Sequence, residues 1–189
     1  MFKHGDISAE RRRDLALDPA KIKPKEKEMR DKATVFEAGQ GKLLSARGSA
    51  MFFKATHAST NGAFSLMERT LPPGGRKPPP HFHTNCEEAF YVLEGEVEFT
   101  LGKEIVVGRS DTFVLVPGGV AHTFGNAGTT QARLLVMHAP AMDAYFEELQ
   151  TLWSQDIPPN REEEMALMRR HGMEPATPDG VRIPPANDQ

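Results

Sequence analysis

Short runs of apolar and β-branched residues, separated by turns rich in glycine and proline, fill the middle of the sequence. The runs cover residues 51–58, 63–71, 87–94, 96–101, 112–117 and 131–140. In the run EVEFTL polar and apolar residues alternate strictly, so Val97, Phe99 and Leu101 are expected to face inward. Short strands at this spacing predict an all-β barrel or sandwich for residues 33–140.

The two ends of the chain differ in composition from this middle part. Residues 1–32 interleave acidic and basic side chains and are expected to form a solvated arm. An arm that packs on a partner subunit is the alternative. At the other end, residues 175–189 are rich in proline and are expected to form a loose tail.

Residues 141–174 predict a helical extension. Apolar side chains recur there at i, i+3, i+4 and i+7 spacing, and the stripe is expected to pack on the barrel or on a second subunit. The stripe consists of Met142, Tyr145, Phe146, Leu149, Leu152 and Trp153. Asn160 followed by Glu163 predicts the start of a second helix, and Gly172 predicts its end.

The composition restricts the partners and the compartment. A length of 189 residues suffices for one domain with a sizeable core and extensions. The formal net charge of -3 argues against a nucleic-acid partner. No apolar stretch approaches the ~18 residues that span a bilayer, so no membrane partner is expected. The single cysteine, Cys86, excludes an intrachain disulfide, and without a secretory segment a cytoplasmic location is expected.

Four residues of types that bind metals are spaced so that they can converge. His81 and His83 point to the same side of an extended segment, because side chains alternate with period two. Glu88, rather than Glu87, shares a strand face with the apolar residues two and four positions later. His122 follows a Pro-Gly-Gly turn at the expected start of another strand. Three imidazoles and one carboxylate are therefore expected to meet from two hairpins.

This set of ligands suits one divalent transition metal: iron, manganese, nickel, cobalt, zinc or copper. Around a tetrahedral ion the four ligands would close the site. Around a six-coordinate ion they leave two positions open for water, dioxygen or a chelating small-molecule substrate. The residues do not distinguish among these metals.

The same residues resemble the two sequence motifs of the cupin superfamily. The first motif, G-x5-H-x-H-x3,4-E-x6-G, is matched by Gly75, His81, His83, Glu88 and Gly95. The second, G-x5-P-x-G-x2-H-x3-N, is matched by Pro117, Gly119, His122 and Asn126. Its opening glycine is replaced by Asp111, a change in a turn that affects no ligand. The resemblance covers about residues 60–140 and implies a double-stranded β-helix, the cupin jelly-roll barrel, with one metal bound by His81, His83, Glu88 and His122.

The layout is similar to that of small single-domain cupins of the quercetin-dioxygenase-like group. This resemblance implies a dioxygenase that acts on a chelating flavonol or a related enolic compound. Glu88 would then be both a metal ligand and the acceptor of the substrate's proton. Two alternatives remain open: a non-catalytic metal- and small-molecule-binding cupin or accessory protein of a biosynthetic pathway, and a metal-dependent isomerase, cyclase or lyase. A homodimer is expected, because sheet edges and the stripe on the C-terminal helix need to be covered.

Four further residues are candidates for the site, and each has two interpretations. Cys86 is either a fifth ligand or redox-sensitive thiol, or a small buried residue, and the second interpretation is preferred. Glu87 is either a hydrogen-bond partner of a ligand histidine or an exposed strand carboxylate. His57 and His138 are interpreted as ordinary strand histidines rather than as catalytic bases.

Overall fold

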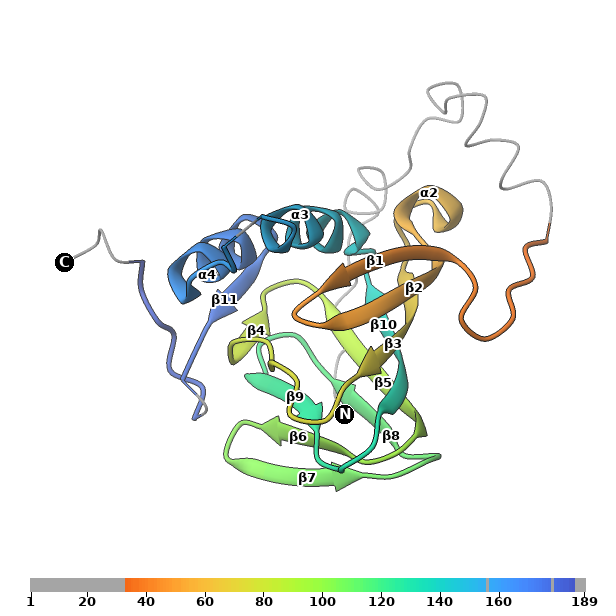
Figure 1. Cartoon of the computed structure of the whole chain (residues 1–189). Coiled ribbons are helices and arrows are strands. Elements are labelled where there is room, and N and C mark those ends of the chain that lie inside the picture. Colours follow the sequence, from red (N-terminus) through yellow and green to blue (C-terminus); the bar gives the residue numbers. More distant parts are fainter. Residues whose placement is uncertain (1–32, 156, 178, 186–189) are drawn as a thin grey trace, which may run out of the picture. The chain divides into compact units, whose positions relative to one another are not determined.

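The computed structural model describes residues 33–155, 157–177 and 179–185 (Figure 1). The charged arm predicted for residues 1–32 lies outside the described residues. Residues 36–189 form one compact unit, and the fold described below is that of this unit. No helix in the described part of the chain is long and apolar enough to cross a membrane.

Two antiparallel sheets make up most of the unit. The first has six strands, in the order β1 (Lys42–Ala46), β2 (Ser49–Ala55), β3 (Ser65–Leu71), β10 (Ala132–Ala139), β5 (Glu87–Glu94) and β8 (Phe113–Val116). The second has five strands, in the order β11 (Met173–Pro175), β4 (His81–His83), β9 (His122–Asn126), β6 (Val97–Leu101) and β7 (Glu104–Gly108). The all-β jelly-roll prediction is confirmed by this arrangement.

The core lies between the sheets and contains aromatic rings from both. The ring of Phe90 on β5 lies 5.2 Å from that of Phe99 on β6 and 4.8 Å from that of Phe124 on β9, measured between centroids. The alternation in β6 is confirmed, because Val97 and Phe99 are buried and Leu101 packs against the core. Strict alternation thus places one face of each sheet in the core.

The C-terminal extension closes one end of the barrel. Helices α3 (Asp143–Trp153) and α4 (Arg161–Arg170) lie side by side, with α3 against β1 and α4 against β11 (Figure 1). The apolar stripe of α3 is part of the barrel core. Of the two partners expected for that stripe, the barrel covers most of it, whereas Leu152 and Trp153 at its end are only partly buried.

The predicted ends of α4 are confirmed. Asn160 accepts a hydrogen bond from the backbone N–H of Glu163 at 3.0 Å, and the Glu163 carboxylate accepts one from the N–H of Asn160 at 2.8 Å. This reciprocal pair satisfies donors that a helix start leaves free. Gly172, just beyond the helix, has φ of 73°, a conformation that side chains with a Cβ rarely adopt.

Two segments differ from their predicted structure. The strand predicted for residues 51–58 ends at Ala55, and His57 begins the short helix α2 (His57–Thr60). At the start of this helix the Ser59 hydroxyl accepts a hydrogen bond from the Thr56 backbone N–H at 3.0 Å, which satisfies a donor that a helix start leaves free. Pro175 was expected to begin the loose tail, but it ends strand β11, which pairs with β4. A proline is tolerated there because β11 is an edge strand.

Candidate metal centre

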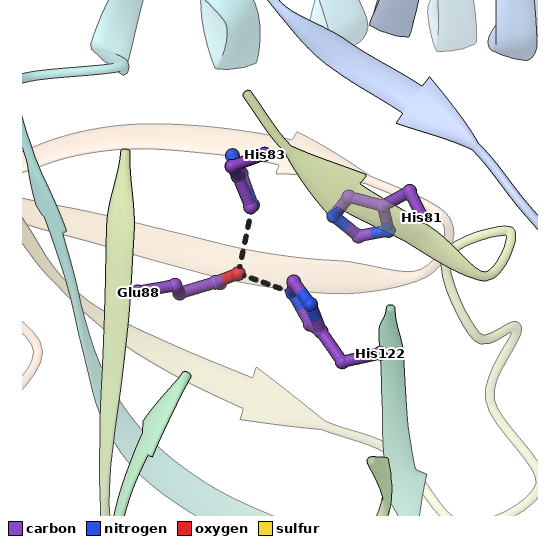
Figure 2. Close-up of side chains that lie close together, drawn as sticks. All are labelled: His81, His83, Glu88 and His122. Atoms are coloured by element: carbon purple, nitrogen blue, oxygen red, sulfur yellow. Dashed lines mark hydrogen bonds and ion pairs between the residues drawn. The ribbon is translucent and has the colours of Figure 1, made fainter. Parts of the chain in front are cut away.

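Strands from both sheets bring His81, His83, Glu88 and His122 together inside the barrel (Figure 2). One potential ligand atom from each residue lies within 4.8 Å of the others, and all four side chains are buried. Strand β4 carries both His81 and His83 on its inner face, β5 carries Glu88, and β9 carries His122. His81 and His122 are direct partners in the pairing of β4 with β9, which brings their rings to 4.5 Å between centroids.

Glu88 is the centre of the cluster. Its Oε2 lies 2.7 Å from His122 Nε2 and 3.1 Å from His83 Nε2 (Figure 2). Its Oε1 lies 3.1 Å from Nε2 of His138. As expected, Glu88 is buried at 3% exposure while Glu87 is exposed, because successive side chains of β5 point to opposite faces.

The surroundings set the protonation of these groups. Burial by itself would raise the pKa of the Glu88 carboxyl. The electrostatic interaction with His138 and the hydrogen bonds with the neighbouring histidines outweigh burial and hold that pKa well below its usual range. Burial, reinforced by the other two histidines, holds the pKa of His81 well below its ordinary value. Burial also lowers the pKa of His83. An ionised carboxylate and neutral imidazoles are the forms that bind metals.

His122 behaves differently. Burial would lower its pKa, but the hydrogen bond to Glu88 and the charge of Glu88 raise it. Both of its ring nitrogens also face acceptors, since Nδ1 lies 3.0 Å from the Val120 carbonyl and Nε2 lies 2.7 Å from Glu88. The doubly protonated ring can donate to both, so a metal would have to displace the proton on Nε2.

The hydrogen bonds outside the cluster orient two of the rings toward a metal. Nδ1 of His81 donates to the Pro79 carbonyl at 2.8 Å, and Nδ1 of His122 donates to the Val120 carbonyl. In both rings the other nitrogen, Nε2, then points toward the centre of the cluster, where a metal would bind. Metal-binding histidines usually donate their other N–H to a carbonyl or carboxylate in this way. The residues therefore fit a divalent transition metal, without deciding which one.

His138 is a member of the site that the sequence interpretation missed. It lies on β10 directly opposite Glu88 in the pairing of β10 with β5, and it is 2% exposed. Its Nδ1 is buried without a hydrogen-bond partner among the described residues. The signal was present in the sequence, because His138 continues the alternation of Leu134 and Val136, which both face the core.

Two buried arginines, Arg47 and Arg69, also line the cavity beside the cluster, and neither was expected. The cavity has a volume of about 20 Å³, room for about one water-sized molecule. Its other lining residues include Phe124, Tyr145, Phe146 and Met173, so the C-terminal extension forms part of its wall. A larger surface groove of about 410 Å³ between α3 and α4 shares no lining residue with this cavity.

The remaining candidates lie outside the cluster. Burial, with the charge of Glu88, raises the pKa of the Cys86 thiol to about 12, which disfavours the thiolate that a metal would need. The thiol donates weakly to the carbonyls of Glu87 and Pro140. His57 is on α2 rather than on a strand.

Comparisons with known proteins match the β part of the chain. Residues 67–138, which include all four clustered residues, match the family model of the cupin domain. The chain is 39% identical over 82 residues to germin-like protein subfamily T member 3 of Arabidopsis thaliana, covering 40% of this chain and 35% of that protein. It is 28% identical over 94 residues to polyketide synthase CurC of Streptomyces cyaneus, covering 50% of this chain and 61% of that protein. The chain thus spans less than two thirds of either relative.

A solved structure shows the same fold. The polyketide cyclase RemF from Streptomyces resistomycificus superposes with a TM-score of 0.50 at 23% sequence identity, covering 57% of this chain and 80% of that chain. The matching family model is that of the cupin domain in general. Membership of the quercetin-dioxygenase-like group stays a prediction.

Proposed function

Because residues 67–138 match the family model of the cupin domain, we propose that the protein holds one divalent transition metal and acts as an enzyme on a small chelating substrate. The observation that carries the proposal is the buried cluster itself. Four ligand atoms lie within 4.8 Å of one another at the centre of a barrel, and two of the rings are oriented by hydrogen bonds to carbonyls. Burying an ionised carboxylate is costly, and a metal would offset that cost.

His81, His83, Glu88 and His122 would hold the ion. A bound divalent ion would supply Lewis acidity, which eases loss of a proton from a coordinated hydroxyl or enol. The oxygen Oε2 of Glu88 faces His83 and His122 and is the oxygen available to the ion. The other oxygen, Oε1, is engaged with His138.

The pair formed by Glu88 and His138 would accept the substrate's proton. The low pKa of Glu88 makes this carboxylate a good ligand but a weak base when it acts alone. His138 lies 3.1 Å from Oε1, and its Nδ1 has no hydrogen-bond partner in the described part of the chain. A proton taken from substrate can therefore be shared between the two groups rather than held by Glu88 alone. The surrounding phenyl rings keep bulk water away from this pair.

Two reaction types follow from the same first proton transfer. In the dioxygenase reading, the deprotonated flavonol or enol reacts with dioxygen and its ring is cleaved. In the second reading the deprotonated substrate is isomerised or cyclised without dioxygen, and the similarity to a polyketide synthase favours this alternative. The shared ligand set suits both reactions.

The test begins with metal content. The protein as purified is expected to contain about one divalent metal per chain, and the His81→Ala, His83→Ala double variant is expected to lose it. His57→Ala, a histidine outside the cluster, is the matched control. Stoichiometric metal in the double variant would reject the site.

Activity is then measured with metal present. Oxygen uptake and product formation are followed with a flavonol and a 1,3-diketone, after loading with iron, manganese, nickel or copper. Oxygen-dependent ring cleavage supports the dioxygenase, and turnover under nitrogen supports the isomerase or cyclase. Binding without turnover in either atmosphere would contradict the enzyme proposal and support a binding protein.

A further inference from the structure

One arginine inside the barrel forms no direct ion pair with a carboxylate of the described residues. Arg69 lies on β3 and is only 2% exposed. It occupies the same strand face as Met67 and Leu71, which belong to the core. Arginine is rarely buried to this extent unless it is paired with an opposite charge. Its presence on a core-facing position therefore requires a partner.

The partners in the described part of the chain do not satisfy it. Nε of Arg69 donates to the Ser49 hydroxyl at 2.9 Å, and the guanidinium lies 5.1 Å from the centroid of the Phe124 ring. Its Nη2 is buried and has no hydrogen-bond partner. Burial, and then the charge of Arg47, lowers the pKa of Arg69 to about 10, which leaves it protonated at neutral pH.

The neighbouring Arg47 shows what a satisfied arginine looks like in the same cavity. Its Nε lies 3.2 Å from a carboxylate oxygen of Glu164, and its Nη2 donates to the Tyr145 hydroxyl at 3.2 Å. The charge of Arg47 is thus balanced within the protein. Arg69 has no equivalent carboxylate among the described residues, although its side chain is equally buried.

Arg69 lines the cavity that His81, His83 and Glu88 also line. If those residues hold a divalent ion, the single carboxylate of Glu88 balances only half of the ion's charge. The charge of Glu88 also favours protonated Arg69, but this one carboxylate would be shared between Arg69 and the ion, so positive charge remains in excess. An anion in this cavity would meet positive charge from two sides, in surroundings where few other dipoles screen it.

We propose that Arg69 is the anion-binding group of this cavity and that the natural ligand is a small carboxylate, which pairs with Nη2 beside the metal. This inference rests on the proposed metal site and defines the substrate class more narrowly. A substrate with a carboxylate next to a hydroxyl or enol could contact both Arg69 and the metal. Arginine donates well to planar carboxylates. Because the cavity of about 20 Å³ admits about one water-sized molecule, it must widen to admit a carboxylate, and a phosphate ester would require it to widen further.

The experiment uses formate as the probe and formamide as its neutral control of the same size. Both are titrated into the zinc-loaded protein by calorimetry, because zinc is redox-inert and binding is then measured without turnover. The wild type is expected to bind formate and to bind formamide at least about tenfold more weakly, since charge-assisted hydrogen bonds are the stronger ones.

The Arg69→Met variant is expected to keep its zinc but to lose at least about tenfold in formate affinity. The control is Arg109→Met. It removes an exposed arginine that pairs with Glu96, neither of which lines the cavity, and this variant should bind formate as tightly as the wild type does. Equal formate affinity in the wild type and in Arg69→Met would overturn the assignment. Phosphate that binds as tightly as formate would overturn the carboxylate class.

Two further measurements keep the outcome decisive. If Arg69→Met does not fold, Arg69→Lys takes its place. It keeps the positive charge and should still bind formate more tightly than formamide. A wild type that binds the two ligands equally well would overturn the proposal. If zinc does not bind at all, the metal proposal fails by itself. Formate should then still raise the unfolding temperature of the metal-free wild type, whereas formamide should not, and the absence of that difference would overturn the role of Arg69.

Discussion

The carboxylate of Glu88 contacts three histidines through its two oxygens. Oε2 faces His83 and His122, and Oε1 faces His138. These contacts make Glu88 the residue on which both proposed roles depend, metal binding and proton transfer. Replacing Glu88 with glutamine tests both roles, because it changes the chemistry of the side chain while keeping its size.

Glu88→Gln keeps the shape of the side chain and removes its charge. We expect weaker metal binding and, after reloading with excess metal, a rate that stays about 10²–10⁴-fold below that of the wild type, because the proton acceptor is lost. Turnover and metal content are measured on the same sample. Glu87→Gln, the exposed neighbour, should change neither quantity. Full activity of metal-loaded Glu88→Gln would contradict the proton-transfer role.

The pKa of His122 predicts how metal binding depends on pH. Its pKa is raised in the metal-free protein by Glu88, against the effect of burial. The protonated ring must lose a proton before Nε2 can bind a metal, so the affinity should rise with pH until His122 is neutral. Below its raised pKa, protons compete with the metal and binding weakens. Calorimetry in two buffers of different ionisation enthalpy should detect proton release on zinc binding at about pH 6. Zinc binding without proton release at that pH would contradict this assignment.

At the scale of elements, a buried ion pair connects the C-terminal helices to the barrel. Arg47, in the turn between β1 and β2, pairs with Glu164 on α4, and both side chains are 1% exposed. Trp153 at the end of α3 donates to the same carboxylate. Helix α3 also supplies part of the cavity wall through Tyr145 and Phe146. The extension therefore belongs to the site as well as to the core.

Breaking this pair on one side should destabilise the fold strongly. Arg47→Met leaves the Glu164 charge buried without its partner, and we expect a loss of about 3–5 kcal/mol in the free energy of unfolding. The double variant Arg47→Met, Glu164→Met should recover much of that loss. Urea denaturation measures both. The exposed pair of Arg170 and Glu148 is the control, for which Arg170→Met should cost less than about 1 kcal/mol. A similarly small loss for Arg47→Met would show that the buried pair contributes little.

At the scale of the whole molecule, apolar side chains remain exposed at one edge of the barrel. Strand β8 is the last strand of the six-stranded sheet, and its Phe113 and Leu115 are 61% and 54% exposed. An edge strand offers unpaired backbone groups and can pair with another chain. The expected homodimer would be explained by a second copy at this edge. Most of the stripe of α3 is buried within the chain, so it adds less to the expectation of a dimer than this edge does.

We predict that the protein sediments as a dimer at micromolar concentration and that Phe113→Glu shifts it to monomer. A charge at this position would be desolvated in the dimer but hydrated in the monomer. Val35→Glu changes an exposed apolar residue that precedes the barrel and is the matched control. A wild type that sediments as a monomer would contradict the homodimer.

Local rules explain why much of the site followed from the sequence. The two-residue alternation placed His81 and His83 on one side and separated Glu88 from Glu87, and the Pro-Gly-Gly turn placed His122 at the start of its strand. Residues close together in the sequence also set the ends of α4, the inward face of β6 and the strand content. Turns, caps and alternation act over a few residues, so one sequence suffices to predict them.

The tertiary structure decided which distant residues complete the cavity. His138 faces Glu88 because β10 pairs with β5, and Arg69 enters the cavity from β3, in a segment whose sequence suggested only a strand. The short strand β11, with no alternation long enough to detect, is a strand because its backbone pairs with β4. These features depend on contacts between residues far apart in the chain, whose pairing is selected by the burial of the whole core rather than by any local pattern.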